Sequence, residues 1–108
     1  MSSHRKAVIK YVRKESRVEV GGPRDCCDFI FKVQGHQPET VSIGITGGWF
    51  DFIPSLGKAL TDEELKAISA EFLERELANG WVPSQKNNRL EIPYPLMEYR
   101  VQNGSFPN

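Results

Sequence analysis

The segment from Thr61 to Gly80 carries start, periodicity and stop signals that agree on one α-helix. Thr61 followed three positions later by Glu64 is the pattern of a capping box, in which each side chain accepts a hydrogen bond from the other residue's backbone N–H. Apolar residues then recur on one helical face, and glycine most readily takes the left-handed conformation just past a helix end. We therefore expect a helix over about 61–79 with one face against a core.

Strand-like sequence lies on both sides of this helix. Residues rich in β-branched and aromatic types, or alternating between apolar and polar, are typical of half-buried strands. The segments of this kind are 6–13 with a continuation towards 20, 27–33, 41–45, 90–92 and 97–101. The turn-forming composition of 35–39 predicts a hairpin between the second and third of these segments. Residues 49–53 could form a further short strand or an aromatic loop.

These elements predict an α+β fold. We expect an antiparallel β-sheet of four to six strands with the main helix packed on one face, in the order β-β-β-β-α-β. A chain of 108 residues has the size of one domain, so we expect a single domain over 1–108 with frayed tails at 1–5 and 103–108. Its apolar runs are far shorter than the roughly 20 residues that span a bilayer, which favours a cytoplasmic protein without membrane contact.

Charge is distributed unevenly although the formal net charge is zero. The helix is rich in acidic residues, whereas the first seventeen residues carry six cations and one carboxylate. Those cations are Arg5, Lys6, Lys10, Arg13, Lys14 and Arg17. Such a segment could follow a phosphate backbone, so nucleic-acid binding is an alternative function. The sequence pI near 6.7 and the interspersed acidic residues speak against it.

The most concentrated aromatic stretch follows two glycines and contains Trp49, Phe50, Asp51 and Phe52. Three aromatic side chains in four extended residues cannot all face one core, so we expect at least one at the surface. Exposed aromatic side chains are frequent hot spots of protein interfaces. The leading hypothesis is therefore a non-catalytic domain, such as an inhibitor, immunity factor or accessory subunit, that binds another protein here. A homodimer is a further alternative.

Signs of catalysis are weak. Adjacent Cys26 and Cys27 would point to opposite faces of a strand, which disfavours a disulfide between them, and no histidine or cysteine spacing matches a zinc site. No glycine pattern fits a phosphate-binding loop, so we expect no metal and no cofactor. A pocket near Asp51 and His36, in a small enzyme or ligand-binding protein, is the second alternative. Glu76 interrupts the apolar helix face and needs a cationic neighbour or solvent.

Overall fold

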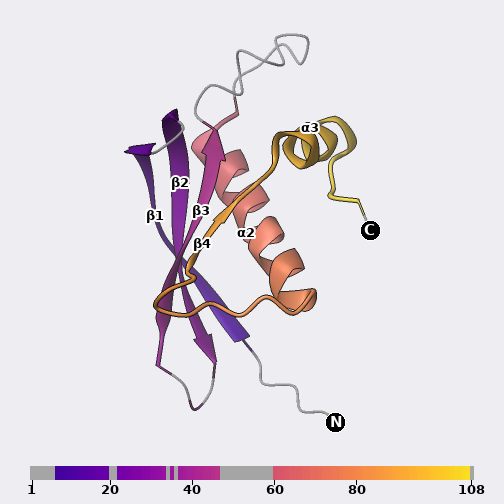
Figure 1. Cartoon of the computed structure of the whole chain (residues 1–108). Helices are drawn as coiled ribbons and strands as arrows, with labels where there is room; N and C mark the ends of the chain where they lie inside the picture. Colours follow the sequence, from indigo (N-terminus) through magenta and orange to yellow (C-terminus); the bar gives the residue numbers. More distant parts are fainter. Residues whose placement is uncertain (1–6, 20–21, 34, 36, 47–59, 108) are drawn as a thin grey trace.

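The structure is a computed structural model that describes residues 7–19, 22–33, 35, 37–46 and 60–107. Strands and helices follow one another as β1 (Ala7–Glu19), β2 (Gly22–Val33), β3 (Glu39–Thr46), α2 (Asp62–Ala78), β4 (Arg89–Glu91) and α3 (Tyr94–Asn103). The strands form one sheet in the order β1-β2-β3-β4. Both helices lie on the same side of this sheet (Figure 1). We call that side the helix face and the other side the open face.

The α+β class and the predicted order, with strands before the main helix and a strand after it, are confirmed. The sheet is mostly antiparallel. The pairs β1–β2 and β2–β3 are antiparallel, while β3 and β4 are parallel. The parallel pair arises because the chain crosses over through α2 before it returns to the sheet. The segment 49–53, which could supply another strand, lies outside the described residues.

Helix α2 begins and ends as its sequence predicts. Thr61 Oγ1 accepts from the Glu64 N–H at 3.1 Å, and the Glu64 carboxylate accepts from the Thr61 N–H at 3.0 Å. Gly80 has a φ of 99°, and the N–H of Trp81 donates to the Glu76 carbonyl, which closes the last turn. The Glu76 carboxylate is 3.1 Å from the neighbouring Arg75 guanidinium, so its charge has a partner.

The prediction of a strand over 97–101 is wrong, because these residues belong to α3. Pro93 precedes the helix, Pro95 occupies its first turn, and Gly104 ends it in the left-handed conformation with φ of 80°. Prolines fit the first turn because its N–H groups lack intrahelical partners anyway. Met97 is buried while Tyr99 is exposed, which matches one helical face turned inward.

The core lies between the helix face and the two helices. Sheet and helix side chains form one buried cluster that contains Cys27, Phe29, Phe31, Val41, Ile43, Ile45, Leu65, Ile68, Phe72, Leu73, Ile92 and Met97. Burial of each large apolar side chain of this kind contributes about 1.5–3 kcal/mol. Near the C-terminus, the ring of Phe106 packs on Phe72 with 5.8 Å between centroids. No helix in the described part of the chain is long and apolar enough to cross a membrane.

Candidate functional site: the open face of the sheet

Several residues predicted to be functional lie outside the described residues. These are Trp49, Phe50, Asp51, Phe52, His36, Arg5 and Lys6. The remaining four cations of the N-terminal segment are all on β1, but they do not share one face. Lys10, Arg13 and Arg17 lie on the open face, whereas Lys14 faces α2 and donates to Asp62 at 2.8 Å. The predicted basic segment is therefore divided between the two sides of the sheet.

An irregularity in β1 places the arginines on the open face. Ile9 and Tyr11 pair with Phe31 and Phe29 and face the helices, but the register shifts between Tyr11 and Arg13. The extra residue is Val12, which forms a β-bulge. Because side chains alternate along a strand, one extra residue moves every later odd-numbered side chain to the opposite face. Arg13, Glu15 and Arg17 thereby join the polar residues of the neighbouring strands.

Asp28 of β2 is the centre of this arrangement. Only 3% of its side chain is exposed, yet it lies on the open face between two arginines and a serine. Its Oδ2 accepts from Arg13 Nε at 3.1 Å and from Arg17 Nη2 at 2.6 Å, and its Oδ1 accepts from Ser42 Oγ at 2.6 Å. Arg17 also donates to Ser42 at 2.7 Å, so its side chain reaches from β1 across β2 to β3. The hydrogen bond from Arg17 to Asp28 is the main reason why the pKa of Arg17 is higher than its ordinary value.

A second group of charges lies at the β4 side of the same face. Arg24 Nε donates to a Glu91 carboxylate oxygen at 2.9 Å, and Arg89 Nη2 is 3.6 Å from that oxygen. The Arg89 guanidinium lies on the backbone of Gly44: a Cβ at position 44 would be 2.7 Å from the Arg89 Cζ. Glycine at this position therefore makes room for an arginine laid flat against the sheet.

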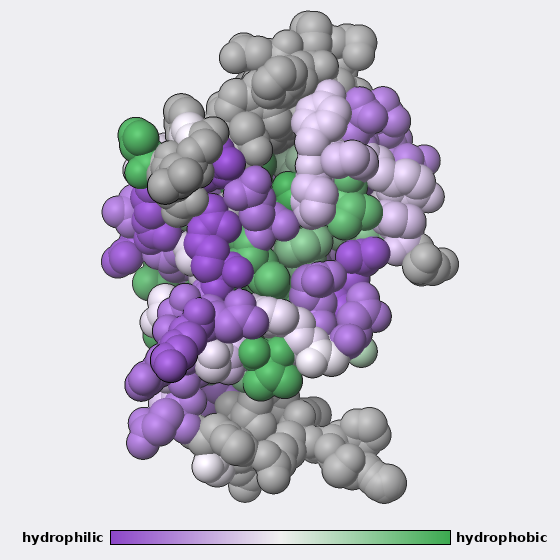
Figure 2. All heavy atoms as spheres, in the orientation of Figure 1, coloured by the Kyte–Doolittle hydropathy of each residue, from purple (hydrophilic) through white to green (hydrophobic). Residues whose placement is uncertain are grey.

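Together these residues form what we call the arginine cluster: Arg13, Arg17, Arg24 and Arg89 with Glu15, Asp28, Ser42 and Glu91. The exposed lysines Lys10 and Lys32 extend the open face beyond the cluster. The arginine cluster and these two lysines together carry six cations and three carboxylates, a net charge of +3 for these named residues. Mostly hydrophilic residues cover the strands in Figure 2, in agreement with this composition.

The two cysteines point to opposite faces, as predicted. Cys26 lies on the open face and Cys27 in the core, and both are buried and free of disulfides. Burial raises the pKa of the Cys27 thiol. The two thiols therefore cannot converge on one site. Within the described ranges, no group of three or more acidic, histidine or cysteine side chains could hold a metal ion.

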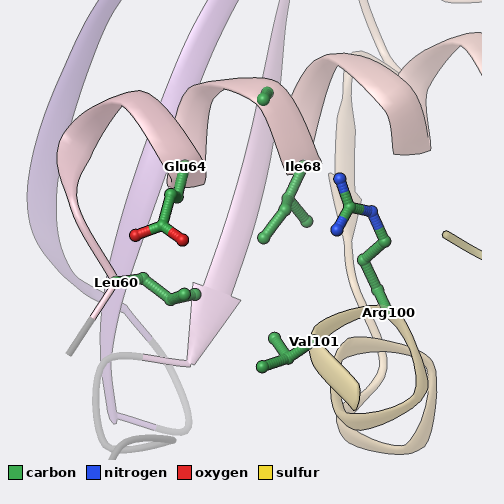
Figure 3. A pocket seen from close by; sticks show the side chains of 6 residues that line it. Leu60, Glu64, Ile68, Arg100 and Val101 are labelled. Atoms are coloured by element: carbon green, nitrogen blue, oxygen red, sulfur yellow. The ribbon is translucent and has the colours of Figure 1, made fainter. Parts of the chain in front are cut away.

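A small pocket lies between the first half of α2 and the C-terminal half of α3 (Figure 3). Its volume is about 160 Å³, and its lining comprises Leu60, Glu64, Ala67, Ile68, Arg100 and Val101. The polar members already have structural roles: Glu64 belongs to the capping box, and Arg100 donates twice to Glu71, at 2.9 and 3.1 Å. The pocket is smaller than the roughly 300–1,000 Å³ of typical ligand sites. The polar side chains of the pocket therefore stabilise α2 and its contact with α3, and they are not arranged as reactive groups.

Of the arginine cluster, the sequence indicates only Arg13 and Arg17 as functional, with Glu15 as the carboxylate between them. It does not indicate the other five members, Arg24, Asp28, Ser42, Arg89 and Glu91. One signal was available for Asp28, since the alternation of β2 places it on the face opposite the apolar residues, between Cys26 and Ile30. The others come together only through strand pairing. Comparison of the chain with protein-family models, curated proteins and solved structures gives no match.

Proposed function

We propose that the chain is a small protein-binding domain, not an enzyme, and that it binds an acidic segment of a partner protein on the open face. The observation that supports this proposal is the arginine cluster, which three strand pairings assemble on a sheet face that no described helix covers. An inhibitor, immunity factor or accessory subunit in the cytoplasm would be a protein of this kind.

Arginine suits such a surface because its planar guanidinium can donate two parallel hydrogen bonds to a carboxylate. The cluster also holds its arginines in place before any partner arrives. Arg17 is tied to Asp28, Ser42 and Glu15, and Arg24 to Glu91. Side chains that are already ordered lose less conformational entropy on binding. The net charge of +3 on the cluster and the two lysines would attract an acidic partner and accelerate its association.

The same observations make nucleic acid the weaker alternative. Sheet surfaces that bind single strands usually stack bases on aromatic side chains. Among the described residues, the open face carries no aromatic side chain. Tyr11 packs edge to face on Phe29 with 5.7 Å between centroids and lies under Lys66 on the helix face. Lys14 is engaged with Asp62, which removes another of the predicted phosphate contacts.

The aromatic segment Trp49 to Phe52 stays a prediction from the sequence and is compatible with the same function. Once a partner protein has been identified, its affinity for Trp49→Ala should be lower than for the wild-type chain if this segment contributes to the interface. The alternative of a pocket near Asp51 and His36 has no supporting observation, since both residues lie outside the described ranges.

The proposal can be tested with a fluorescent oligoglutamate peptide and a single-stranded oligonucleotide of equal charge, using fluorescence anisotropy. The informative variant is Lys10→Glu with Lys32→Glu, because both lysines are exposed and reversal leaves the cluster intact. We expect peptide affinity to fall about ten-fold in this variant and to fall with added salt. Lys86→Glu is the matched control, since Lys86 lies in the turn between Ser84 and Asn87 rather than on a strand.

Three results would contradict the proposal. One is the absence of peptide binding at low salt. Another is an equal loss per reversed charge in the Lys86→Glu control, which would show dependence on net charge alone. The third is tighter binding of the oligonucleotide than of the peptide, which would favour the nucleic-acid alternative.

A further inference from the structure

The two edges of the sheet differ in length. Strand β4, at one edge, has three residues, whereas β1, at the other, has 13. Natural proteins usually keep exposed edge strands short, because the unpaired N–H and C=O groups invite another strand. In the described part of the chain, nothing pairs with the outer edge of β1. A strand more than twice the usual length of about 5–6 residues is thus left available at that edge.

The bulge at Val12 divides β1, and the part after it is regular. From Arg13 to Glu19 the pairing with β2 runs without interruption. This regular part has a charge pattern that complements itself: positions 13, 15, 17 and 19 are Arg, Glu, Arg and Glu. Read in the opposite direction, the same positions are Glu, Arg, Glu and Arg. An antiparallel copy can therefore place both arginines of this pattern opposite a carboxylate.

We propose that two copies of this chain associate through the outer edges of β1, antiparallel and with a two-fold axis at Ser16. In this register Glu15 lies opposite Arg17 of the second copy, and Arg13 opposite its Glu19. Lys14 lies opposite Val18 of the second copy. The two described four-stranded sheets become one sheet of eight strands, with α2 and α3 of both copies on the same side. The two open faces then form one continuous surface.

Exposure at the edge is consistent with this register. The Val18 residue is 90% exposed, and the side chains of Arg13 and Glu15 are 61% and 45% exposed. The aliphatic part of Lys14 in the second copy would cover Val18. Cross-strand pairs of opposite charge stabilise a sheet, and like charges destabilise it.

Neighbouring registers fit less well. An axis at Glu15 would place Arg13 opposite Arg17 of the second copy. An axis at Lys14 would oppose two lysines and extend the pairing into the bulge at Val12.

A cysteine at position 16 tests the register directly. Directly opposed residues of antiparallel strands have Cα atoms about 4.5–5.5 Å apart, within the range that disulfides span. Ser16→Cys should therefore form a disulfide between two copies under mild oxidation. Val18→Cys is the matched control on the same strand, because its two copies would lie about 13 Å apart and should not cross-link. The natural cysteines are buried and should not interfere.

A second pair of variants tests the dimer without a covalent bond. Val18→Lys would oppose Lys14 of the second copy, and Val18→Glu would attract it, while both replace the same exposed side chain. Sedimentation equilibrium should show wild type and Val18→Glu at twice the chain mass. The dissociation constant of Val18→Lys should be about ten-fold higher than that of Val18→Glu, because the contact occurs twice.

The proposal is overturned by a wild-type chain that stays monomeric at every accessible concentration. It is also overturned by equal cross-linking at positions 16 and 18, or by equal dissociation constants for the two charged variants. These outcomes do not bear on the oligoglutamate experiment, which requires no second copy.

Discussion

Removal of the charge of Asp28 should destabilise the protein, although Asp28 lies on the face away from the core. Asp28→Asn keeps the volume of the side chain and one oxygen acceptor. It replaces the other oxygen with an N–H₂ group. If this group replaces Oδ2, it faces the donors of Arg13 and Arg17. If it replaces Oδ1, it faces the Ser42 hydroxyl, which must turn from donor to acceptor, and the arginines keep only a neutral amide oxygen.

The magnitude follows from the three contacts. The Arg17 bond is short, at 2.6 Å, and the Arg17 side chain is 28% exposed, so loss of its charge assistance costs about 1–2 kcal/mol. The Arg13 side chain is 61% exposed and can turn to water, which limits its contribution to less than about 1 kcal/mol. Loss or reversal of the Ser42 hydrogen bond adds up to about 1 kcal/mol. Relief of carboxylate desolvation offsets part of this cost, so we expect a net loss of about 2 kcal/mol.

Urea denaturation followed by far-UV circular dichroism measures this loss. With slopes typical of small domains, the midpoint should fall by about 1 M. Asp25→Asn is the matched control, because Asp25 is a neighbour on the same strand whose hydrogen bond to Ser16 is exposed. It should change the free energy of unfolding by less than about 0.5 kcal/mol. Equal midpoints for Asp28→Asn and wild type would refute the view that this buried carboxylate organises the open face.

Three further predictions concern separate features. Burial raises the pKa of the Cys27 thiol, so this thiol ionises at a lower pH in the unfolded chain than in the folded protein. The free energy of unfolding should therefore fall as pH rises above about 8.5, and it should fall less steeply in Cys27→Ala. Urea titrations at several pH values measure both. Thr61→Ala removes half of the capping box with Glu64 and should cost about 1 kcal/mol in the same assay. Gly44→Ala should displace the Arg89 guanidinium from the backbone of residue 44. The free energy of unfolding should fall by less than about 1 kcal/mol, whereas the affinity for oligoglutamate, measured by fluorescence anisotropy, should fall measurably.

The parts of the fold that local signals specify could be predicted from the sequence. Helix α2 has its cap, its apolar stripe and its terminal glycine within one segment. In β2, apolar and polar residues alternate regularly over the predicted strand 27–33. The segment 97–101 was ambiguous, because Met97, Tyr99 and Val101 alternate as in a strand while Met97 and Val101 are also one helical turn apart. The two prolines before them were the better signal, since both fit a helix start.

The candidate site was less predictable because its members are distant in sequence. Arg24 and Glu91 are separated by 67 positions, and they meet only because β3 lies between their strands and brings both to one face. The parallel pairing of β4 depends on where the crossover through α2 returns the chain. No local pattern encodes that return.

The bulge at Val12 explains why the basic segment could be recognised from composition but not placed. Strict alternation from Ile9 and Tyr11 would direct Arg13, Glu15 and Arg17 towards α2 and the core. Burial of three charged side chains there would cost several kcal/mol each without partners. One unpaired residue in the strand is the smaller cost, so the bulge is the favoured solution. It gives Asp28 its two arginine partners, and it leaves the regular segment Arg13–Glu19 that the proposed dimer uses. A single extra residue thus determines which side of the sheet carries the charge.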